Sequence, residues 1–218
     1  MPNGPQLVTG APELTIVGRS SSHFTRVTRI FAFELGLEPA LRVVHSLASA
    51  SASDYGGNPA LRIPALVAPS GTWFGALSVC RELMRQARSE RRVIWPEALD
   101  RPLLANAQEL TVQAMSTEVS LIMGSLNGAE LPAAHREKLA TSLHGSLGWL
   151  DENIAAVLQL LPARDLSLLE VTLFCLLAHL EFRALLPLGG YARLQDFCAR
   201  YAERPSARAT PFCFDPSS

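Results

Sequence analysis

The sequence predicts a small α/β domain followed by an all-helical domain. Short β-branched apolar runs alternate with helical patterns up to residue 88, and no strand pattern follows residue 99. The 218 residues suffice for one large domain or two compact ones, and the 48% of hydrophobic residues supply a core for either. We expect domains at residues 14–88 and 100–210, a linker at 89–99, a flexible N-terminal tail at 1–13 and a C-terminal tail at 211–218.

A strand, a helix and a second strand open the first domain. Residues Leu14–Gly18 are a short apolar run with β-branched side chains, and Ser22 is a suitable N-cap for the helical pattern that runs to residue 37. The run Ala40–His45 supplies the next strand. If the helix is a right-handed crossover, these two strands lie parallel.

A loop, a hairpin and a helix complete this domain. The small and polar residues 46–57 are typical of a mobile surface loop. Residues 64–68 and 72–74 are two short strands, and the three residues between them, 69–71, give the spacing of a hairpin. A helix over about 75–88 follows.

Four helical patterns make up the second domain. They cover roughly residues 101–126, 132–161, 167–186 and 191–203, and Gly, Pro and Asn signals separate them. The third is apolar enough to be a buried helix, so its His179 is expected to be a hydrogen-bonded core residue. Ser167 and Glu170 have the spacing of a capping box at the start of that helix.

Charge and hydropathy exclude several classes of protein. A net charge of −1, without a long single-sign run, argues against nucleic acid and membrane binding. Charged side chains interrupt the most apolar stretch, 166–188, so it is not a membrane anchor. The first residues lack the features of a signal peptide, so we expect a cytoplasmic protein. The four cysteines lack metal-ligand spacing and are expected to be reduced, and no metal site is predicted.

Two segments of the first domain resemble motifs of a known family. Residues 58–66, NPALRIPAL, resemble the pattern N-P-x-G-x-V-P-A-L, and residues 22–30, SHFTRVTRI, resemble S/C-P-F-x-R-x-V-R-I. With the order of the elements, they make the chain similar to the soluble glutathione transferase superfamily over residues 14–204, as a serine-type or divergent bacterial member. The resemblance implies a thioredoxin-like first domain, an all-α second domain and glutathione as co-substrate.

The resemblance also implies where glutathione binds. Pro64 matches the family's cis-proline, and the main chain of Ile63 before it would pair with glutathione as with an extended peptide. The other glutathione-binding positions fall on Arg62, Gly75 and Ala76. In the family, a Glu/Gln-Ser pair stands where this chain has Gly75 and Ala76, and it holds the γ-glutamyl end. Its loss predicts weak glutathione binding, because each hydrogen bond to a charged group contributes about 1.5 to 3 kcal/mol.

Ser22 falls at the family's catalytic position. A helix N-terminus and a hydroxyl there favour thiolate over thiol, and the thiolate is the form that attacks electrophiles. Ser20 and Ser21 are close enough in sequence to be alternative hydroxyls. His23 replaces the family's proline, and we weigh a role near the thiol against an exposed residue of the first helical turn.

The electrophile pocket would lie on the first long helix of the second domain. The resemblance places Met115, Glu118 and Val119 there, whereas helical core packing is the alternative for the apolar pair. The predicted function is a glutathione S-transferase-like enzyme that attacks a hydrophobic electrophile, as a homodimer. Two alternatives stay open: a binding or scaffold protein of the same fold with lost or weak glutathione binding, and use of a different thiol or anionic ligand.

Overall fold

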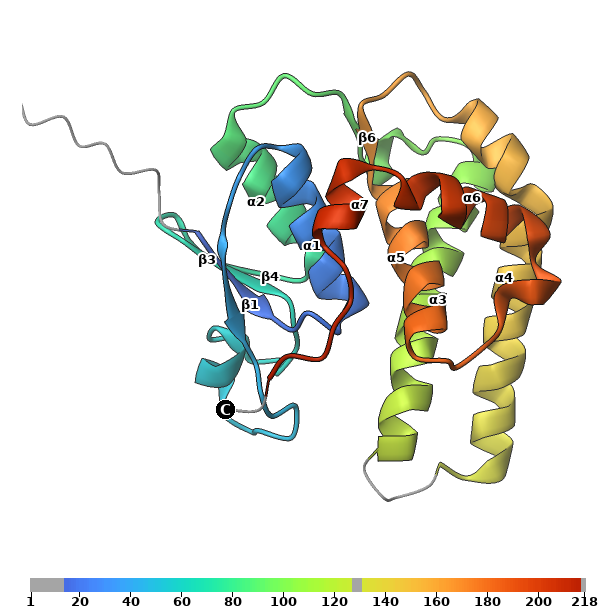
Figure 1. Ribbon diagram of the computed structural model, residues 1–218, viewed down its shortest axis with the longest axis horizontal. Coiled ribbons are helices and arrows are strands. Elements are labelled where there is room, and N and C mark those ends of the chain that lie inside the picture. Colours follow the sequence, from blue (N-terminus) through green and yellow to red (C-terminus); the bar gives the residue numbers. More distant parts are fainter. Residues whose placement is uncertain (1–13, 127–130, 217–218) are drawn as a thin grey trace, which may run out of the picture.

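The computed structural model describes residues 14–126 and 131–216. The predicted tail at residues 1–13 and the turn signal at residues 127–128 lie outside these ranges. The chain forms an α/β part and a helical part that stand side by side (Figure 1). None of the helices in the described ranges is long and apolar enough to cross a membrane.

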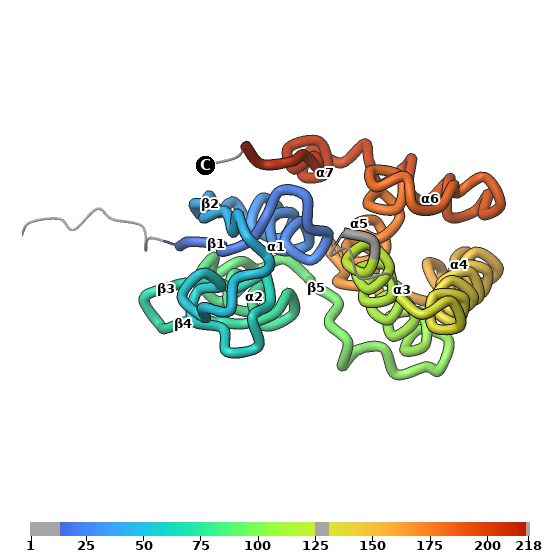
Figure 2. Tube along the Cα trace, turned by 90° about the horizontal axis from the view of Figure 1, so that it is seen from below, coloured from blue at the N-terminus to red at the C-terminus, as the bar shows by residue number. Residues whose placement is uncertain are grey.

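The α/β part contains a four-stranded sheet in the order β2-β1-β3-β4. Its strands are β1 (Thr15–Gly18), β2 (Ala40–Val43), β3 (Ala65–Ala68) and β4 (Gly71–Phe74). Strands β1 and β2 are parallel because helix α1 (His23–Glu34) is the crossover between them, and β3 pairs antiparallel with both β1 and β4. Helix α2 (Ala76–Ala87) packs beside α1 (Figure 2).

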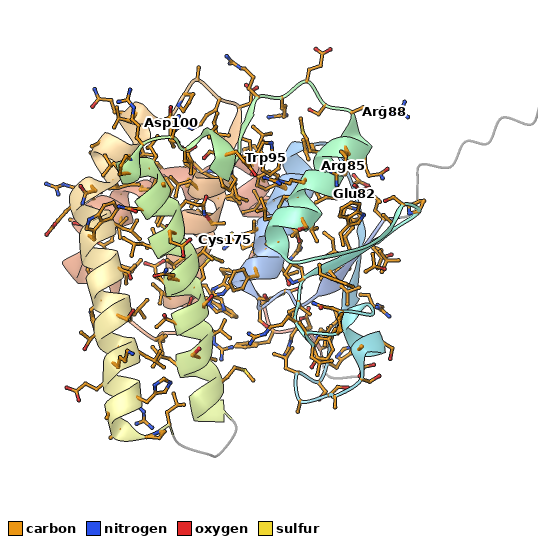
Figure 3. The ribbon with its side chains drawn as sticks, turned by 180° about the vertical axis from the view of Figure 1, so that it is seen from behind. Glu82, Arg85, Arg88, Trp95, Asp100 and Cys175 are labelled. Atoms are coloured by element: carbon orange, nitrogen blue, oxygen red, sulfur yellow. The ribbon has the colours of Figure 1, made fainter. Side chains whose placement is uncertain are left out.

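Helix α2 is bonded to the β3–β4 turn through one buried carboxylate, that of Glu82. Glu82 accepts hydrogen bonds from Ser70 Oγ at 2.7 Å, Arg85 Nε at 2.7 Å and Gln86 Nε2 at 2.6 Å (Figure 3). Burial opposes its ionisation, but these hydrogen bonds lower the pKa of Glu82 below its ordinary value. These hydrogen bonds fix the position of α2 relative to the β3–β4 hairpin.

The helical part is built around one buried helix. Its helices are α3 (Pro102–Leu126), α4 (Ala133–Leu160), α5 (Leu168–Phe182), α6 (Ala192–Ala202) and α7 (Pro205–Ala209), with short 3-10 turns η2 (Pro96–Ala98) and η3 (Leu188–Gly190). Helix α5 packs against α3 and α6 and also against α1 of the α/β part. Because it is covered on several sides, it is apolar nearly all round, as the sequence predicts.

The structure differs from the sequence prediction between the two parts. Within the predicted linker, β5 (Val93–Ile94) pairs in parallel with β6 (Leu166–Ser167), just before α5. The predicted capping box is wrong, because the buried Ser167 Oγ has no hydrogen-bond partner and makes no cap contact. Glu170 instead accepts from Arg164 Nη2 at 2.8 Å.

The loop before the hairpin is more ordered than its composition predicts. A 3-10 turn, η1 (Ala52–Tyr55), lies inside residues 46–57, and Tyr55 is buried. The Tyr55 hydroxyl lies 3.0 Å from the Leu47 carbonyl and 3.1 Å from the Ser49 carbonyl, so it donates back to its own loop. One buried aromatic ring therefore anchors a segment that looks mobile from its small, polar residues.

Candidate functional site

A cleft of about 1280 Å³ lies between the α/β part and the helical part. The α/β part contributes the loop before α1, the loop before β3 and the start of α2. The helical part contributes one face of α3, the ends of α5 and the C-terminal segment. This volume is larger than most single-ligand pockets, so the cleft has room for a peptide and a second small molecule.

The loop before α1 is shaped by a close approach between backbone and side chain. Gly18 ends β1, and a Cβ at this position would lie 2.4 Å from Thr25 Oγ1. The same oxygen accepts a hydrogen bond from the Arg19 N–H at 3.4 Å. A residue without a side chain is therefore required at position 18 for the loop to turn tightly onto the helix.

Ser22 is the N-cap of α1 and lines the cleft. Its backbone is extended, and its Oγ accepts a hydrogen bond from the Thr25 N–H at 3.3 Å. An oxygen that accepts from the helix keeps its own hydrogen available, so the hydroxyl can donate to a ligand in the cleft. The helix N-terminus adds a positive electrostatic potential at the same point.

The other two serines have different surroundings. Ser20 is buried, lies outside the cleft lining, and its N–H donates to Asp215 Oδ2 at 2.9 Å. Ser21 lines the cleft, but its carbonyl oxygen is held by His179 Nε2 at 2.9 Å. Of the three, Ser22 is the hydroxyl that combines a cleft position with the helix N-terminus.

Ile63 and Pro64 also line the cleft, and the bond between them is cis. Asn58 holds this loop from inside, because its Nδ2 donates to the Arg62 carbonyl at 2.8 Å and its Oδ1 accepts from the Ala60 N–H at 3.0 Å. Among the described residues, no hydrogen bond uses the main-chain N–H or C=O of Ile63. Both groups are therefore available to an extended ligand.

The start of α2 is bare by comparison. Gly75 is its N-cap, with φ of 80°, and has no side chain to cap the helix; Ala76 follows as the first helical residue. Both line the cleft, and the Gly75 N–H is engaged by the Pro64 carbonyl at 3.0 Å. This end of the cleft offers backbone donors of a helix N-terminus and no polar side chain at these two positions.

Of the three residues predicted for the electrophile pocket, only Val119 lines the cleft. Met115 and Glu118 are both fully buried and face away from it. The reason is helical periodicity: Val112, Ser116, Val119 and Met123 recur at the spacing of one face of α3. Glu118 points to α1 and α5 instead, and Met115 belongs to the hydrophobic core.

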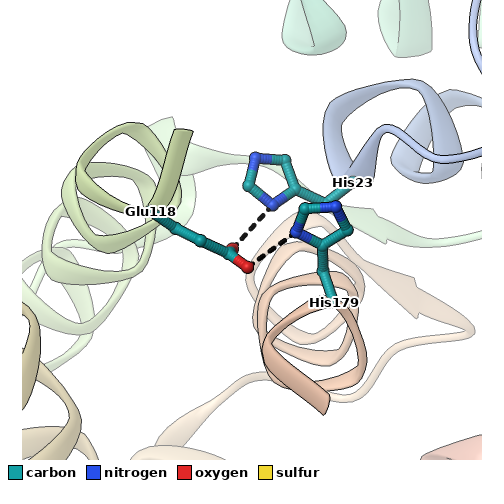
Figure 4. A group of neighbouring side chains, drawn as sticks. All are labelled: His23, Glu118 and His179. Atoms are coloured by element: carbon teal, nitrogen blue, oxygen red, sulfur yellow. Dashed lines mark hydrogen bonds and ion pairs between the residues drawn. The ribbon is translucent and has the colours of Figure 1, made fainter. Parts of the chain in front are cut away.

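Glu118 is the centre of a buried hydrogen-bond network that joins three elements. Its Oε2 lies 3.0 Å from His23 Nδ1 on α1, and its Oε1 lies 2.7 Å from His179 Nδ1 on α5 (Figure 4). The three side chains are between 0 and 5% exposed. The prediction that His179 is a hydrogen-bonded core residue is thus correct, whereas the first-turn residue His23 is buried rather than exposed.

The network needs three shared hydrogens, which fixes its proton content. His179 Nε2 must donate, since the Ser21 carbonyl only accepts, and one hydrogen must lie in each of the two contacts with Glu118. Two neutral imidazoles bring two hydrogens, so one further proton is held between Glu118 and His179. The network is then neutral overall, which is the least costly state for buried groups.

Burial disfavours the charged form of both His23 and Glu118, but it determines the direction of the pKa shift only for His23. Desolvation lowers the pKa of His23, although its contact with Glu118 opposes that effect. Burial opposes ionisation of Glu118 as well, but the hydrogen bonds from His179 and His23 lower its pKa.

Two imidazoles and a carboxylate can also bind a transition metal, and their ligand atoms lie within 4.8 Å of one another. Here the distances from Glu118 to the two histidines are those of hydrogen bonds, and the three side chains are almost fully buried. The three residues are therefore arranged to share protons rather than to bind a metal ion.

The C-terminal segment, predicted as a tail after the helical domain, packs over the same loop. Besides the bond from Asp215 to Ser20, Phe212 stacks on Phe182 with ring centroids 5.4 Å apart. Arg26 of α1 lies beneath Phe212, with its guanidinium carbon 4.3 Å from the ring centroid. Of this segment, Phe214 lines the cleft and contributes to its wall.

The charges that line the cleft are mostly positive. They are Arg19, Arg62 and Arg183, against the single carboxylate of Glu109. No cysteine is among the lining residues, and burial raises the pKa of Cys175 to about 12. The site is therefore suited to an anionic ligand and supplies no nucleophilic thiol of its own.

Comparison with solved structures places this architecture in a known fold. Similar chains include a glutathione S-transferase from Methylobacillus flagellatus with GSH bound, 20% identical, with 92% of this chain and 100% of that one covered and a TM-score of 0.76. A glutathione transferase family member from Pseudomonas fluorescens Pf-5 with bound S-(propanoic acid)-glutathione is 19% identical, with coverages of 91% and 100% and a TM-score of 0.70.

A third, from Methylobacterium radiotolerans in complex with glutathione sulfonate, is 17% identical, with coverages of 94% and 98% and a TM-score of 0.71. No protein-family model matches the sequence, and the search of curated proteins found no match. The resemblance stated from the two motifs thus extends to the whole fold, and the chain has the glutathione S-transferase fold.

Proposed function

We propose that the chain is a glutathione S-transferase-like enzyme that stabilises a thiolate for attack on a hydrophobic electrophile. The observation that carries this proposal is the position of Ser22, whose hydroxyl caps α1 at the edge of the cleft. Structural neighbours that were solved with glutathione or its derivatives bound add support.

The chemistry follows from this placement. Glutathione would lie along the loop before β3, paired with the free main-chain groups of Ile63, with its sulfur at the N-terminus of α1. The thiol gives its proton to solvent, and the Ser22 hydroxyl and the helix dipole stabilise the thiolate left behind. The sulfur then forms a bond to an electrophilic carbon, from which a leaving group departs with the electron pair.

The second substrate would bind on the helical side of the sulfur. That wall is largely apolar, because Val112, Val119 and Met123 of α3 and Phe214 of the C-terminal segment line it, and Phe24 of α1 adds a further aromatic ring to the cleft lining. The three lining arginines favour a ligand with negative charge, which keeps a different thiol or anionic ligand as a variant of the same proposal.

One observation favours a second candidate, a binding or scaffold protein that uses glutathione poorly. Gly75 and Ala76 provide no side chain for the γ-glutamyl carboxylate and ammonium groups. The loss of even one hydrogen bond to a charged group weakens binding by roughly ten- to a hundredfold. The fold would then persist without efficient conjugation.

The deciding experiment is a calorimetric titration with glutathione, paired with a conjugation assay on a chlorodinitrobenzene. The enzymatic proposal expects saturable glutathione binding and a large loss of kcat in Ser22→Ala. Ser21→Ala is the matched control, because it lines the cleft but holds the network through its main chain. An intact fold with no glutathione binding at millimolar concentration supports the scaffold candidate instead.

A homodimer and a cytoplasmic location remain predictions. Sedimentation analysis can test the first.

A further inference from the structure

We propose that His179 and Glu118 are positioning residues for the catalytic loop, which hold the Ser21 carbonyl before Ser22 and the His23 side chain after it and so aim the Ser22 hydroxyl at the bound thiol. The inference rests on the function proposed above. Its basis is the buried network of His23, Glu118 and His179 (Figure 4). His23 and His179 border the cleft, whereas Glu118 lies behind them and outside its lining.

The first argument concerns the peptide unit that precedes Ser22. Its carbonyl, that of Ser21, accepts from His179 Nε2 at 2.9 Å, and its N–H, that of Ser22, donates to the Arg19 carbonyl at 3.1 Å. A peptide unit is planar, so two contacts on opposite sides fix its orientation. Together with the φ of −100° at Ser22, that orientation determines where the Cα–Cβ bond of Ser22 points.

The second argument concerns the residue that follows. His23 is the first residue of α1, and its Nδ1 contacts Glu118 Oε2 at 3.0 Å. Ser22 therefore stands between two residues that are both bound, directly or through one carboxylate, to long helices of the other part. Helices α3 and α5 pack against each other, so these anchors belong to one rigid unit.

The third argument concerns charge. The network is neutral when it holds its extra proton, so it can be buried at low cost beneath a site that must stabilise an anion. A lone carboxylate at position 118 would oppose thiolate formation nearby. The neutral network adds no negative charge, so the positive potential at the N-terminus of α1 still stabilises the thiolate. Positioning and electrostatics thus favour the same arrangement.

The experiment measures the pKa of glutathione bound to the full chain, from the ultraviolet absorbance of the thiolate, together with kcat and KM. In His179→Asn the shorter side chain reaches only the position of Nδ1 and loses Ser21, whereas in His179→Gln the amide reaches the position of Nε2 and keeps it. We expect His179→Asn to raise the pKa of the bound thiol by about one unit and to lower kcat about tenfold or more, with little change in glutathione affinity. His179→Gln should recover most of both.

Glu118 supplies the rescue test. Glu118→Ala removes both contacts, whereas Glu118→Gln can donate to His179 Nδ1 and accept from His23 Nδ1, so it should behave like the wild type. His144→Asn is the matched control, because His144 bonds to Tyr191 on the exposed surface, far from the cleft lining. Should Glu118→Ala not fold, the contrast between the two His179 variants decides.

The outcomes separate this inference from the proposed function. A wild type that lowers the thiol pKa, with folded His179→Asn and Glu118→Ala variants that lower it equally, overturns the positioning role and leaves the proposed function in place. A loss of kcat that is equal in the Asn and Gln variants also overturns it, since Gln keeps the contact with Ser21, which the inference makes decisive, and gives up the one with Glu118, whereas Asn does the reverse. A wild type that binds no glutathione overturns both.

Discussion

The two ends of the cleft in the α/β part differ in how much structure supports them. At the loop before α1, contacts arrive from three distant segments: α3 through Glu118, α5 through His179 and the C-terminal segment through Asp215. At the start of α2, Gly75 and Ala76 have no side-chain cap and no polar side chain of their own. We call the loop before α1 the built end of the cleft and the start of α2, at Gly75 and Ala76, its bare end.

Under the proposed function, this difference means that thiol activation and peptide affinity depend on different elements and are separable. The groups that would stabilise a thiolate belong to the N-terminus of α1 and to the network that holds it. The groups that would bind the γ-glutamyl end belong to α2, on a different element. A chain can therefore keep the first and reduce the second, and changes at the two ends should have different kinetic signatures.

The largest effect is expected from restoring a hydroxyl at the bare end. Ala76→Ser adds a donor beside the backbone N–H groups of α2, where the γ-glutamyl carboxylate would lie. A hydrogen bond to a charged group contributes about 1.5 to 3 kcal/mol, so glutathione should bind roughly ten- to a hundredfold more tightly with kcat little changed. Calorimetric titration measures the gain.

Ala76→Val is the control for this prediction, because it adds volume without a hydrogen-bonding group. Equal affinity in the Ser and Val variants would contradict the idea that the bare end limits binding. Replacing Gly75 is less informative. Its φ of 80° lies in the region that favours glycine, so any side chain there adds strain of about 1 to 3 kcal/mol.

The next effect comes from the C-terminal contact at the built end. Asp215→Ala leaves the N–H of buried Ser20 without its acceptor. A buried unpaired donor costs about 1 to 3 kcal/mol, and we expect the lower part of this range because the contact is only part-buried. Urea denaturation should show the lost stability, and kcat should fall severalfold while glutathione affinity is kept. Asp215→Asn retains an acceptor oxygen and should lose less; an unchanged kcat in Asp215→Ala would separate the C-terminal segment from catalysis.

Sequence patterns predict the fold well because its signals are local. The apolar runs, the N-cap at Ser22 and the hairpin turn each lie within a few residues, and the parallel pairing of β1 and β2 follows from the crossover between them. Short strands carry no such signal. The two-residue β5 and β6 pair across more than 70 residues of chain, and neither is long enough to show an alternating pattern.

The site was harder to predict, and residue 118 shows why. Helix α3 carries apolar and polar residues on more than one face, so its sequence does not reveal which face meets the cleft and which meets α5. Glu118 is 95 residues from His23 and 61 from His179. Only tertiary packing brings them together. A glutamate among the apolar residues of α3, with two histidines elsewhere in the chain, is the one signal that could have suggested a partner set.

A smaller effect is expected on the pH dependence of stability, which reports whether burial lowers the pKa of His23. Burial lowers the pKa of His23, so between its folded value and about 6.5 the unfolded chain binds a proton that the folded chain does not. Stability must therefore fall as the pH drops below about 6.5, by up to about 1.4 kcal/mol per pH unit from this residue. His23→Asn removes the titrating group and should flatten that slope in urea denaturation at pH 7.5 and 5.5. Parallel slopes in the two proteins would mean that His23 titrates normally.

The smallest effect is expected between the two ends, at Arg62. Its guanidinium is solvent-exposed beside Ile63, where the glycyl carboxylate of glutathione would lie. An exposed ion pair contributes about 0.2 to 1 kcal/mol, so Arg62→Met should raise the KM for glutathione about fivefold at most and leave kcat unchanged. The difference should shrink in high salt, because exposed charges are screened. Arg200→Met, on the exposed surface of α6 away from the cleft lining, removes the same charge and serves as the control. A loss of kcat in Arg62→Met would show that this arginine acts on the built end, and the separation of activation from affinity would then fail at the residue that lies between them.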